Sequence, residues 1–196
     1  MLQKKSTRIR KEEIVQAALA VVGKKGVRAL TIAAIAEEAG MSEANIYRHF
    51  GGKDDIYAAL GDFIGSAVMG NAATIAGGSR KPLEKLETIF RSHIALLVGH
   101  PGIPRFVFSD DVHLTHRNLS KILAQRIGNY VDTIAGIIEA GIVEGEVRPG
   151  LVPRETALTL LGMIQITALR WSIDNASLDI KVEAEKLWRN FLGLIR

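Results

Sequence analysis

The chain has 196 residues, of which 47% are hydrophobic and 23% are charged, a composition typical of a folded globular protein and not of a disordered one. It contains no cysteine, which excludes disulfide scaffolds, thiolate metal sites and cysteine nucleophiles, and favours a reducing, cytoplasmic location. The longest uncharged run, residues 63–79, carries polar residues and four glycines, so we expect no membrane span.

Positive charge is concentrated in the N-terminal quarter of the chain. Residues 1–53 hold ten Lys and Arg side chains against five acidic ones, whereas the remaining residues are almost balanced. This asymmetry suggests a polyanionic partner at one end of the molecule, although a solvated basic surface would give the same count.

Two helices are predicted first in this basic segment. Apolar residues recur with a helical period over 11–23, and Gly23 and Gly26 are expected to end that helix. Thr31 can cap a second helix, which Gly40 should stop.

A third helix is predicted from Ser42 to about Phe50, only three residues after the second. Two short helices joined by such a glycine-containing turn form the helix-turn-helix unit, whose second helix lies in the DNA major groove. We expect Ile46, Tyr47 and Phe50 to point into a small core. The opposite face then carries side chains that can reach base edges and phosphates: Ser42, Glu43, Asn45, Arg48 and His49. Lys53 follows at the start of the next helix and adds a positive charge. A helical hairpin with a merely solvated face is the alternative.

Helical patterns continue through the rest of the chain, at 54–76, 82–99, 104–114, 119–144, 154–174 and 181–195, without an alternating strand pattern. We therefore predict an all-α fold, with an N-terminal three-helix helix-turn-helix DNA-binding domain (1–53) and a C-terminal helical domain (54–196). Gly61, Gly65 and Gly70 inside the 54–76 helix indicate either a compliant link or close packing against a bulky neighbour.

The segment of about residues 7–60 resembles the DNA-binding domain of the tetracycline-repressor (TetR) family. The resemblance rests on a Thr before Ile-Ala, then Ala-Gly-x-Ser, then Ile-Tyr-x-His-Phe, then Lys and an aliphatic residue. It implies phosphate contacts from Thr31, Tyr47, His49 and Lys53, and a base-facing stretch of Ser42, Glu43, Ala44, Asn45 and Arg48. Two departures are Ala44, where a glycine is frequent, and Gly51-Gly52 in place of the usual polar residue before the lysine, which puts the capping of the next helix in doubt.

The remainder of the chain resembles the family only in plan, which implies that the helical domain of residues 54–196 serves ligand binding and dimerisation. The resemblance implies a homodimer in which the 154–174 and 181–195 helices of two subunits pack as a four-helix bundle. The 154–174 helix is apolar almost all round, which indicates burial on every side, and a central helix of a monomer is the alternative explanation. A dimer suits a repressor because two heads read a palindrome.

An effector pocket is expected among the middle helices, with an apolar lining and a few polar groups. The candidate lining residues are Phe90, His93, Leu97, Phe106, Phe108, His113, Tyr130, Ile134, Gln165 and Trp171. Asp110, His113 and His116 have a helical spacing that could ligate a metal, but charged groups near a helix start are usually solvated caps, so we predict neither metal nor cofactor.

The chain shows no G-x-S-x-G elbow, phosphate-binding glycine loop, dinucleotide fingerprint or H-E-x-x-H motif, so we predict no enzyme. We predict a cytoplasmic, homodimeric transcriptional regulator that binds specific DNA sequences. The favoured activity is a repressor released from a palindromic operator by a small, mainly apolar effector. An architectural or protein-partner-regulated DNA-binding protein without such an effector is the alternative.

Overall fold

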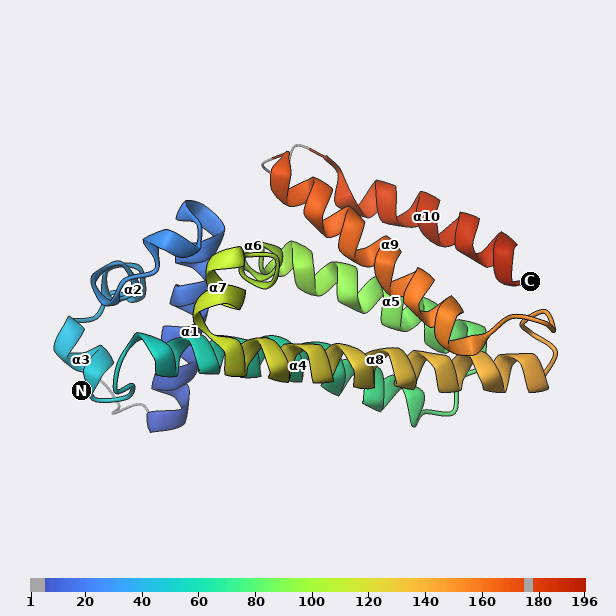
Figure 1. Ribbon diagram of the computed structural model, residues 1–196, viewed down its shortest axis with the longest axis horizontal. Coiled ribbons are helices and arrows are strands. Elements are labelled where there is room, and N and C mark those ends of the chain that lie inside the picture. The colour runs from blue at the N-terminus through green and yellow to red at the C-terminus, as the bar shows by residue number, and fades with distance from the viewer. Residues whose placement is uncertain (1–5, 175–177) are drawn as a thin grey trace. The chain divides into compact units, whose positions relative to one another are not determined.

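The structure is a computed structural model that describes residues 6–174 and 178–196, and within them it is helical throughout and has no strand (Figure 1). The all-α prediction is thereby confirmed. The elements are α1 (Thr7–Lys25), the 3-10 turn η1 (Val27–Ala29), α2 (Ile32–Ala39), α3 (Glu43–Tyr47), α4 (Lys53–Ala76), α5 (Pro82–Gly99), α6 (Gly102–Val107), α7 (Asp110–Thr115), α8 (Arg117–Val143), α9 (Pro153–Ile173) and α10 (Ile180–Ile195).

The chain forms two compact units. The first comprises Met1–Ile64 and His100–Ile122, and the second comprises Gly65–Gly99 and Leu123–Arg196. The long helices α4 and α8 each contribute residues to both units.

In the first unit, α1 packs against α2 and α6, and glycines make the second of these contacts possible. A Cβ atom on Gly102 would lie 2.1 Å from the carbonyl oxygen of Leu19, and a Cβ on Gly23 would lie 3.1 Å from the backbone nitrogen of Gly102. The prediction that Gly23 helps to end the first helix is therefore wrong, because α1 continues past it to Lys25 and the residue is needed for close packing. Gly26, at a φ of 83°, is the residue that ends α1.

Two predicted helices differ from those observed. The 104–114 pattern is two short helices, α6 and α7, because the backbone leaves the helical conformation at Phe108 and becomes extended at Ser109 (ψ 123°). The third helix ends at Tyr47 instead of reaching Phe50, and residues 48–49 form a turn.

The glycines of α4 mainly serve close packing against α8. In the first unit, a Cβ on Gly61 would lie 2.3 Å from Leu119 Cδ1, and in the second unit a Cβ on Gly65 would lie 2.0 Å from Arg126 Nη1. Gly70 has open space around it. Two of the three glycines therefore favour the packing explanation over a compliant link.

The core of the second unit is built by α5, α9 and α10, which contact one another. Trp188 joins two helices there, since its ring centroid lies 5.5 Å from that of Phe90 and 5.9 Å from that of Phe191. The turn after α8 is bonded to two helices of this bundle: the Arg148 N–H donates to the Ile195 carbonyl (2.8 Å) of α10, and the Glu146 carboxylate accepts from the Leu83 N–H (3.1 Å) of α5.

Candidate DNA-binding and effector sites

Local hydrogen bonds set the geometry of the helix-turn-helix. The Thr31 hydroxyl accepts from the Ala34 N–H (3.1 Å) and caps α2, while the Ser42 hydroxyl accepts from the Asn45 N–H (3.3 Å) and caps α3. Between them Gly40 ends α2 in the left-handed conformation, with φ 61° and ψ 39°. The three capping residues predicted from the sequence are therefore in place, and they fix where each helix of the unit starts or stops.

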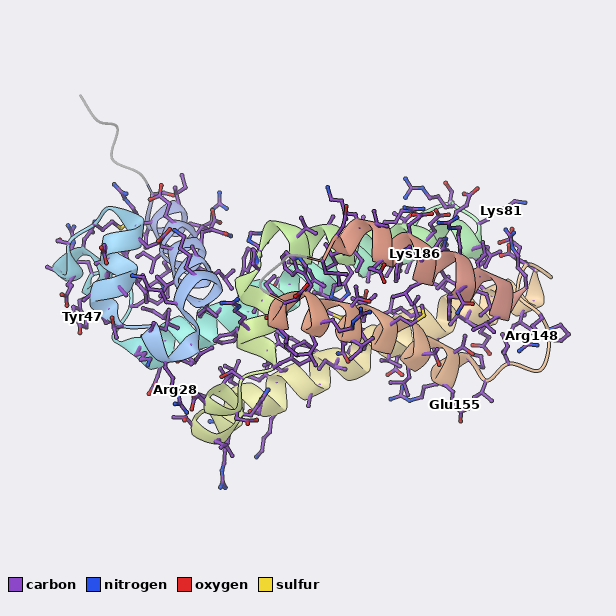
Figure 2. The ribbon with its side chains drawn as sticks, turned by 90° about the horizontal axis from the view of Figure 1, so that it is seen from above. Arg28, Tyr47, Lys81, Arg148, Glu155 and Lys186 are labelled. Atoms are coloured by element: carbon purple, nitrogen blue, oxygen red, sulfur yellow. The ribbon has the colours of Figure 1, made fainter. Side chains whose placement is uncertain are left out.

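One face of α3 is buried and the other is open. Ile46 is fully buried and Phe50 is 5% exposed, but Tyr47 is 56% exposed. Figure 2 shows Tyr47 at the surface of the first unit. The prediction that Tyr47 points into the core is wrong, because successive residues of a helix are rotated by about 100° and Tyr47 is turned away from the face that Ile46 occupies. Its exposure suits the phosphate contact that the family resemblance implies.

All nine candidate DNA-binding residues lie in the first unit, at the starts of α2 and α4 and along α3 with its following turn. Asn45 and His49 are half-buried, and the others are exposed: Thr31, Ser42, Glu43, Ala44, Tyr47, Arg48 and Lys53. The Nδ1 atom of His49 is buried without a hydrogen-bond partner among the described residues. A buried polar atom without a hydrogen-bond partner is uncommon in a folded protein. The described residues therefore leave the hydrogen-bonding capacity of this ring partly unsatisfied.

Ion pairs neutralise part of the positive charge of the first unit, so that this part is not available to bind phosphate. Four of its basic side chains pair with carboxylates: Arg8 with Glu12, Arg10 with Glu13, Lys24 with Glu38, and Arg28 with Asp111. Within the described residues, no carboxylate lies within ion-pair distance of Arg48 or Lys53. The positive charges of Arg48 and Lys53, beside α3, therefore stay available to phosphate.

A side chain of the first turn of α4 ties down the glycine pair before that helix. The Asp55 carboxylate reaches back and accepts from the Gly51 N–H (2.8 Å), so it fixes the loop before the helix and does not cap the N–H groups of the first turn. Lys53 lies with Nζ 5.3 Å from the ring centroid of Tyr57, which orients the ammonium at the start of α4.

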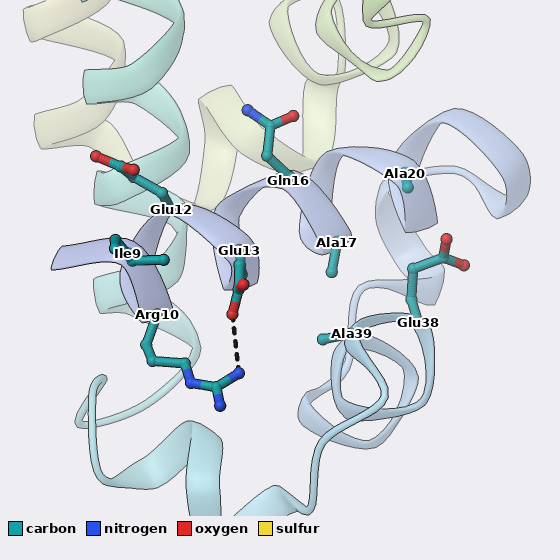
Figure 3. A pocket seen from close by; sticks show the side chains of 9 residues that line it. All are labelled: Ile9, Arg10, Glu12, Glu13, Gln16, Ala17, Ala20, Glu38 and Ala39. Carbon is teal, nitrogen blue, oxygen red and sulfur yellow. Dashed lines mark hydrogen bonds and ion pairs between the residues drawn. The ribbon is translucent and has the colours of Figure 1, made fainter. Parts of the chain in front are cut away.

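A shallow depression of about 590 Å³ lies on the first unit between α1 and α2 (Figure 3). Its walls carry Glu12, Glu13 and Glu38, and Arg10 is held by Glu13 at 2.9 Å. Each of these carboxylates is paired with a basic side chain, and none of the nine candidate DNA-binding residues lines the depression.

The ten candidate effector residues are divided between the two units. Phe106, Phe108 and His113 belong to the first unit, and the other seven belong to the second. In the first unit Phe106 packs against Tyr57 (ring centroids 5.6 Å apart) and Phe108 is 39% exposed. In the second, Phe90, Leu97, Ile134 and Trp171 are buried core residues and Gln165 is half-buried.

Two of the predicted residues, His93 and Tyr130, line a cavity in the second unit between α4, α5 and α8. Its volume is about 10 Å³, space for about one water molecule. Six further residues line it that were not among the predicted ones: Val68, Asn71, Ala72, Ile89, Ser92 and Leu96. Their spacing of three or four residues on α4 and on α5 was the available signal, but it shows which residues share a face and not which helix that face meets.

The possible metal ligands serve structural roles. His113 Nε2 lies 2.6 Å from the Val107 carbonyl oxygen and its Nδ1 lies 3.2 Å from the Ser120 hydroxyl. His116 stacks on Tyr57 with ring centroids 4.2 Å apart. In the part of the chain that the structure describes, no group of three His, Asp or Glu side chains is arranged to hold a metal ion.

An apolar surface remains on α9 and α10, which we call the α9–α10 face: Leu158, Ile166 and Ile173 on α9, and Val182 and Leu194 on α10. Each of these is about half exposed or more, so α9 is not buried on every side within one chain. The length and composition of α9 also meet the minimum for a membrane span, but 44% of its most apolar stretch is buried, as in a helix that packs inside a protein. The α9–α10 face is therefore an apolar surface that one chain alone leaves uncovered.

Comparisons with known proteins agree with both halves of this description. The sequence profile described as "Bacterial regulatory proteins, tetR family" matches residues 14–60, and "Tetracyclin repressor-like, C-terminal domain" matches residues 79–192, more than half of the chain. The fatty acid metabolism regulator protein of Bacillus subtilis (strain 168) is 25% identical over 169 residues, which is 86% of each chain. The nucleoid occlusion factor SlmA of Marinobacter nauticus is 29% identical over 150 residues, 76% of this chain and 74% of SlmA.

A solved structure gives the same fold. The transcriptional regulator FadR from Bacillus subtilis in complex with stearoyl-CoA superposes with a TM-score of 0.74 at 22% identity, and the match covers 94% of this chain and 99% of FadR.

Proposed function

Because the chain belongs to the TetR family of bacterial regulatory proteins, we propose that it is a homodimeric repressor released from a palindromic operator by a small, mainly apolar effector. The α3 helix of each subunit enters the major groove of one half-site, and the nine exposed or half-buried residues described above contact bases and phosphates. In functional terms, residues 1–53 bind DNA and residues 54–196 bind the effector and dimerise. The protein acts on DNA in the cytoplasm and performs no catalysis.

This proposal rests on α4, because this one helix contributes residues to the DNA-binding segment and to the cavity. This helix begins with Lys53 at the DNA-binding segment, and Val68 and Ala72 in its later turns line the cavity beside His93. Since the cavity holds about 10 Å³, an effector can enter only by moving α4, α5 or α8. An effector that binds the widened arrangement more tightly shifts the protein toward it, and α4 conveys that shift to the helix-turn-helix.

Fatty acyl-CoA is the effector class that we assign. Half of the residues that line the cavity are aliphatic, and this part of the lining suits a hydrocarbon chain. The Bacillus subtilis relative is a fatty acid metabolism regulator, and the similar FadR structure contains stearoyl-CoA.

Selection of bound duplexes from a random DNA pool, at near-physiological salt, tests the first half of this proposal. One enriched palindrome is expected, and the same duplex should be released by stearoyl-CoA. Sequence-blind, salt-sensitive binding that stearoyl-CoA leaves unchanged would favour an architectural protein without an effector.

A further inference from the structure

The cavity of the second unit has an unusual polar end. His93 Nδ1 lies 3.0 Å from the Tyr130 hydroxyl, and the two rings meet edge to face, with centroids 5.5 Å apart and planes at 84°. Tyr130 is 3% exposed, whereas His93 is only part-buried. Since both rings line the cavity, a molecule that enters it meets this pair.

The pair offers one hydrogen-bond donor and one acceptor in either tautomer of the histidine. If the Tyr130 O–H donates to Nδ1, then the His93 Nε2–H is left to donate and the phenol oxygen to accept. If Nδ1–H donates to the phenol oxygen, then the Tyr130 O–H is left to donate and Nε2 to accept. This arrangement is complementary to a carbonyl group, which needs one hydrogen-bond donor. It is equally complementary to a hydroxyl group, which needs one donor and one acceptor.

Both members of the pair are uncharged at neutral pH. Burial lowers the pKa of His93 from 6.5 to about 4, so that the imidazole is neutral at pH 7. Burial also raises the pKa of the Tyr130 phenol, so that it stays protonated. The polar end therefore holds no charge of either sign.

The rest of the lining adds no charge to the cavity. Asn71 and Ser92 are its other polar residues, and the remaining four are apolar. Arg126, one helical turn before Tyr130 on α8, packs over Gly65 and is already engaged in an interaction of its own. A carboxylate in this cavity would lose its hydration and find neutral donors only, and an ionised group transferred in this way costs several kcal/mol unless it is paired.

We infer that the His93–Tyr130 pair selects effectors that present an uncharged hydrogen-bonding group on an apolar body, such as an ester or thioester carbonyl, and rejects the free carboxylate. This inference rests on the proposed function, since it concerns the same effector site. It gives the protein a means to respond to an activated or esterified chain while ignoring the free acid of equal length.

A matched pair of ligands tests this inference on the unaltered full-length protein. Binding of decanoic acid and of methyl decanoate would be measured by titration calorimetry at pH 8, where the acid is ionised. Methyl decanoate should bind roughly tenfold more tightly or better. Equal or tighter binding of the acid would overturn the inference and leave the proposed function standing. If neither ligand binds, both the apolar effector and this selectivity are wrong.

Two variants assign the selectivity to the pair. Tyr130→Phe should weaken methyl decanoate binding about fivefold and leave decanoic acid binding unchanged, because only the ester uses the hydroxyl. Tyr57→Phe, which removes the hydroxyl of a buried tyrosine in the first unit, should change neither. Loss of affinity for both ligands in Tyr130→Phe would contradict a specific contact. If this variant does not fold, the relative affinities of the unaltered protein for the two ligands still test the inference.

Discussion

Leu119 of α8 lies directly over Gly61 of α4, so that a Cβ atom on the glycine would be 2.3 Å from Leu119 Cδ1. A side chain at Gly61 would therefore force the end of the Leu119 side chain to move. Gly70, on the same helix, has no atom within 4 Å of its Cβ position and is exposed. One helix thus contains a glycine required by packing and a glycine that packing does not require.

Alanine substitutions should separate these two glycines. Gly70→Ala is expected to stabilise the protein by about 0.5–1 kcal/mol, because alanine loses less backbone entropy in a helix. Gly61→Ala is expected to destabilise it by about 1–2 kcal/mol, because Leu119 must move to make room. Urea unfolding of both variants measures the difference, and equal stabilisation by the two would contradict the packing described here.

Arg48→Ala should weaken operator binding without affecting folding. Arg48 is exposed beside α3, so the free energy of unfolding should change by less than about 0.5 kcal/mol. Operator affinity should fall roughly tenfold, the usual effect of losing one base or phosphate contact. Fluorescence anisotropy with labelled operator gives the affinity. Lys81→Ala, at an exposed lysine of the second unit, is the control and should bind normally.

A charge in the α9–α10 face should separate the subunits. Ile166 is 51% exposed in one chain, so Ile166→Glu is expected to keep the helical content of the monomer while opposing burial against a second copy. Sedimentation equilibrium should then show monomers, and operator affinity should collapse because one head contacts one half-site. Leu114→Glu, at a 78% exposed leucine of the first unit, should remain dimeric. A dimeric Ile166→Glu protein would place the interface elsewhere.

His93 should make the stability depend on pH between about 6.5 and 4. Burial lowers the pKa of His93 to about 4 from an unfolded value of 6.5, so in this window the unfolded chain binds a proton that the folded chain does not. The stabilisation is complete above pH 6.5 and declines as the pH falls, by up to about 3 kcal/mol in total. Urea unfolding of the unaltered protein and of His93→Gln should diverge in slope across this window. Parallel curves would mean that His93 is not buried in the neutral form.

The DNA-binding segment could be predicted well because its signals are local. Thr31, Gly40 and Ser42 each act on backbone groups within a few residues, and the structure has all three in these roles. The position of Tyr47 is not predicted correctly because an aromatic side chain on a helix need not be buried, and only Ile46 and Phe50 share the buried face.

What could not be predicted depends on contacts distant in sequence. The role of Gly23 is set by Gly102, which no local pattern relates to it. The cavity joins Val68 on α4, Ser92 on α5 and Tyr130 on α8, and periodicity within each helix does not specify which faces of different helices meet. The division of the effector candidates between two units has the same cause, since Phe106 and His113 follow α5 in sequence but pack with the helix-turn-helix unit.

The most direct test of the proposed function is the operator affinity of the full-length dimer with and without saturating stearoyl-CoA, at one fixed salt concentration. The proposed mechanism predicts that the ligand weakens operator binding at least about tenfold, a coupling of about 1.4 kcal/mol, and that saturating operator weakens ligand binding by the same factor. An operator affinity that stays constant while stearoyl-CoA is bound would contradict an effector-released repressor.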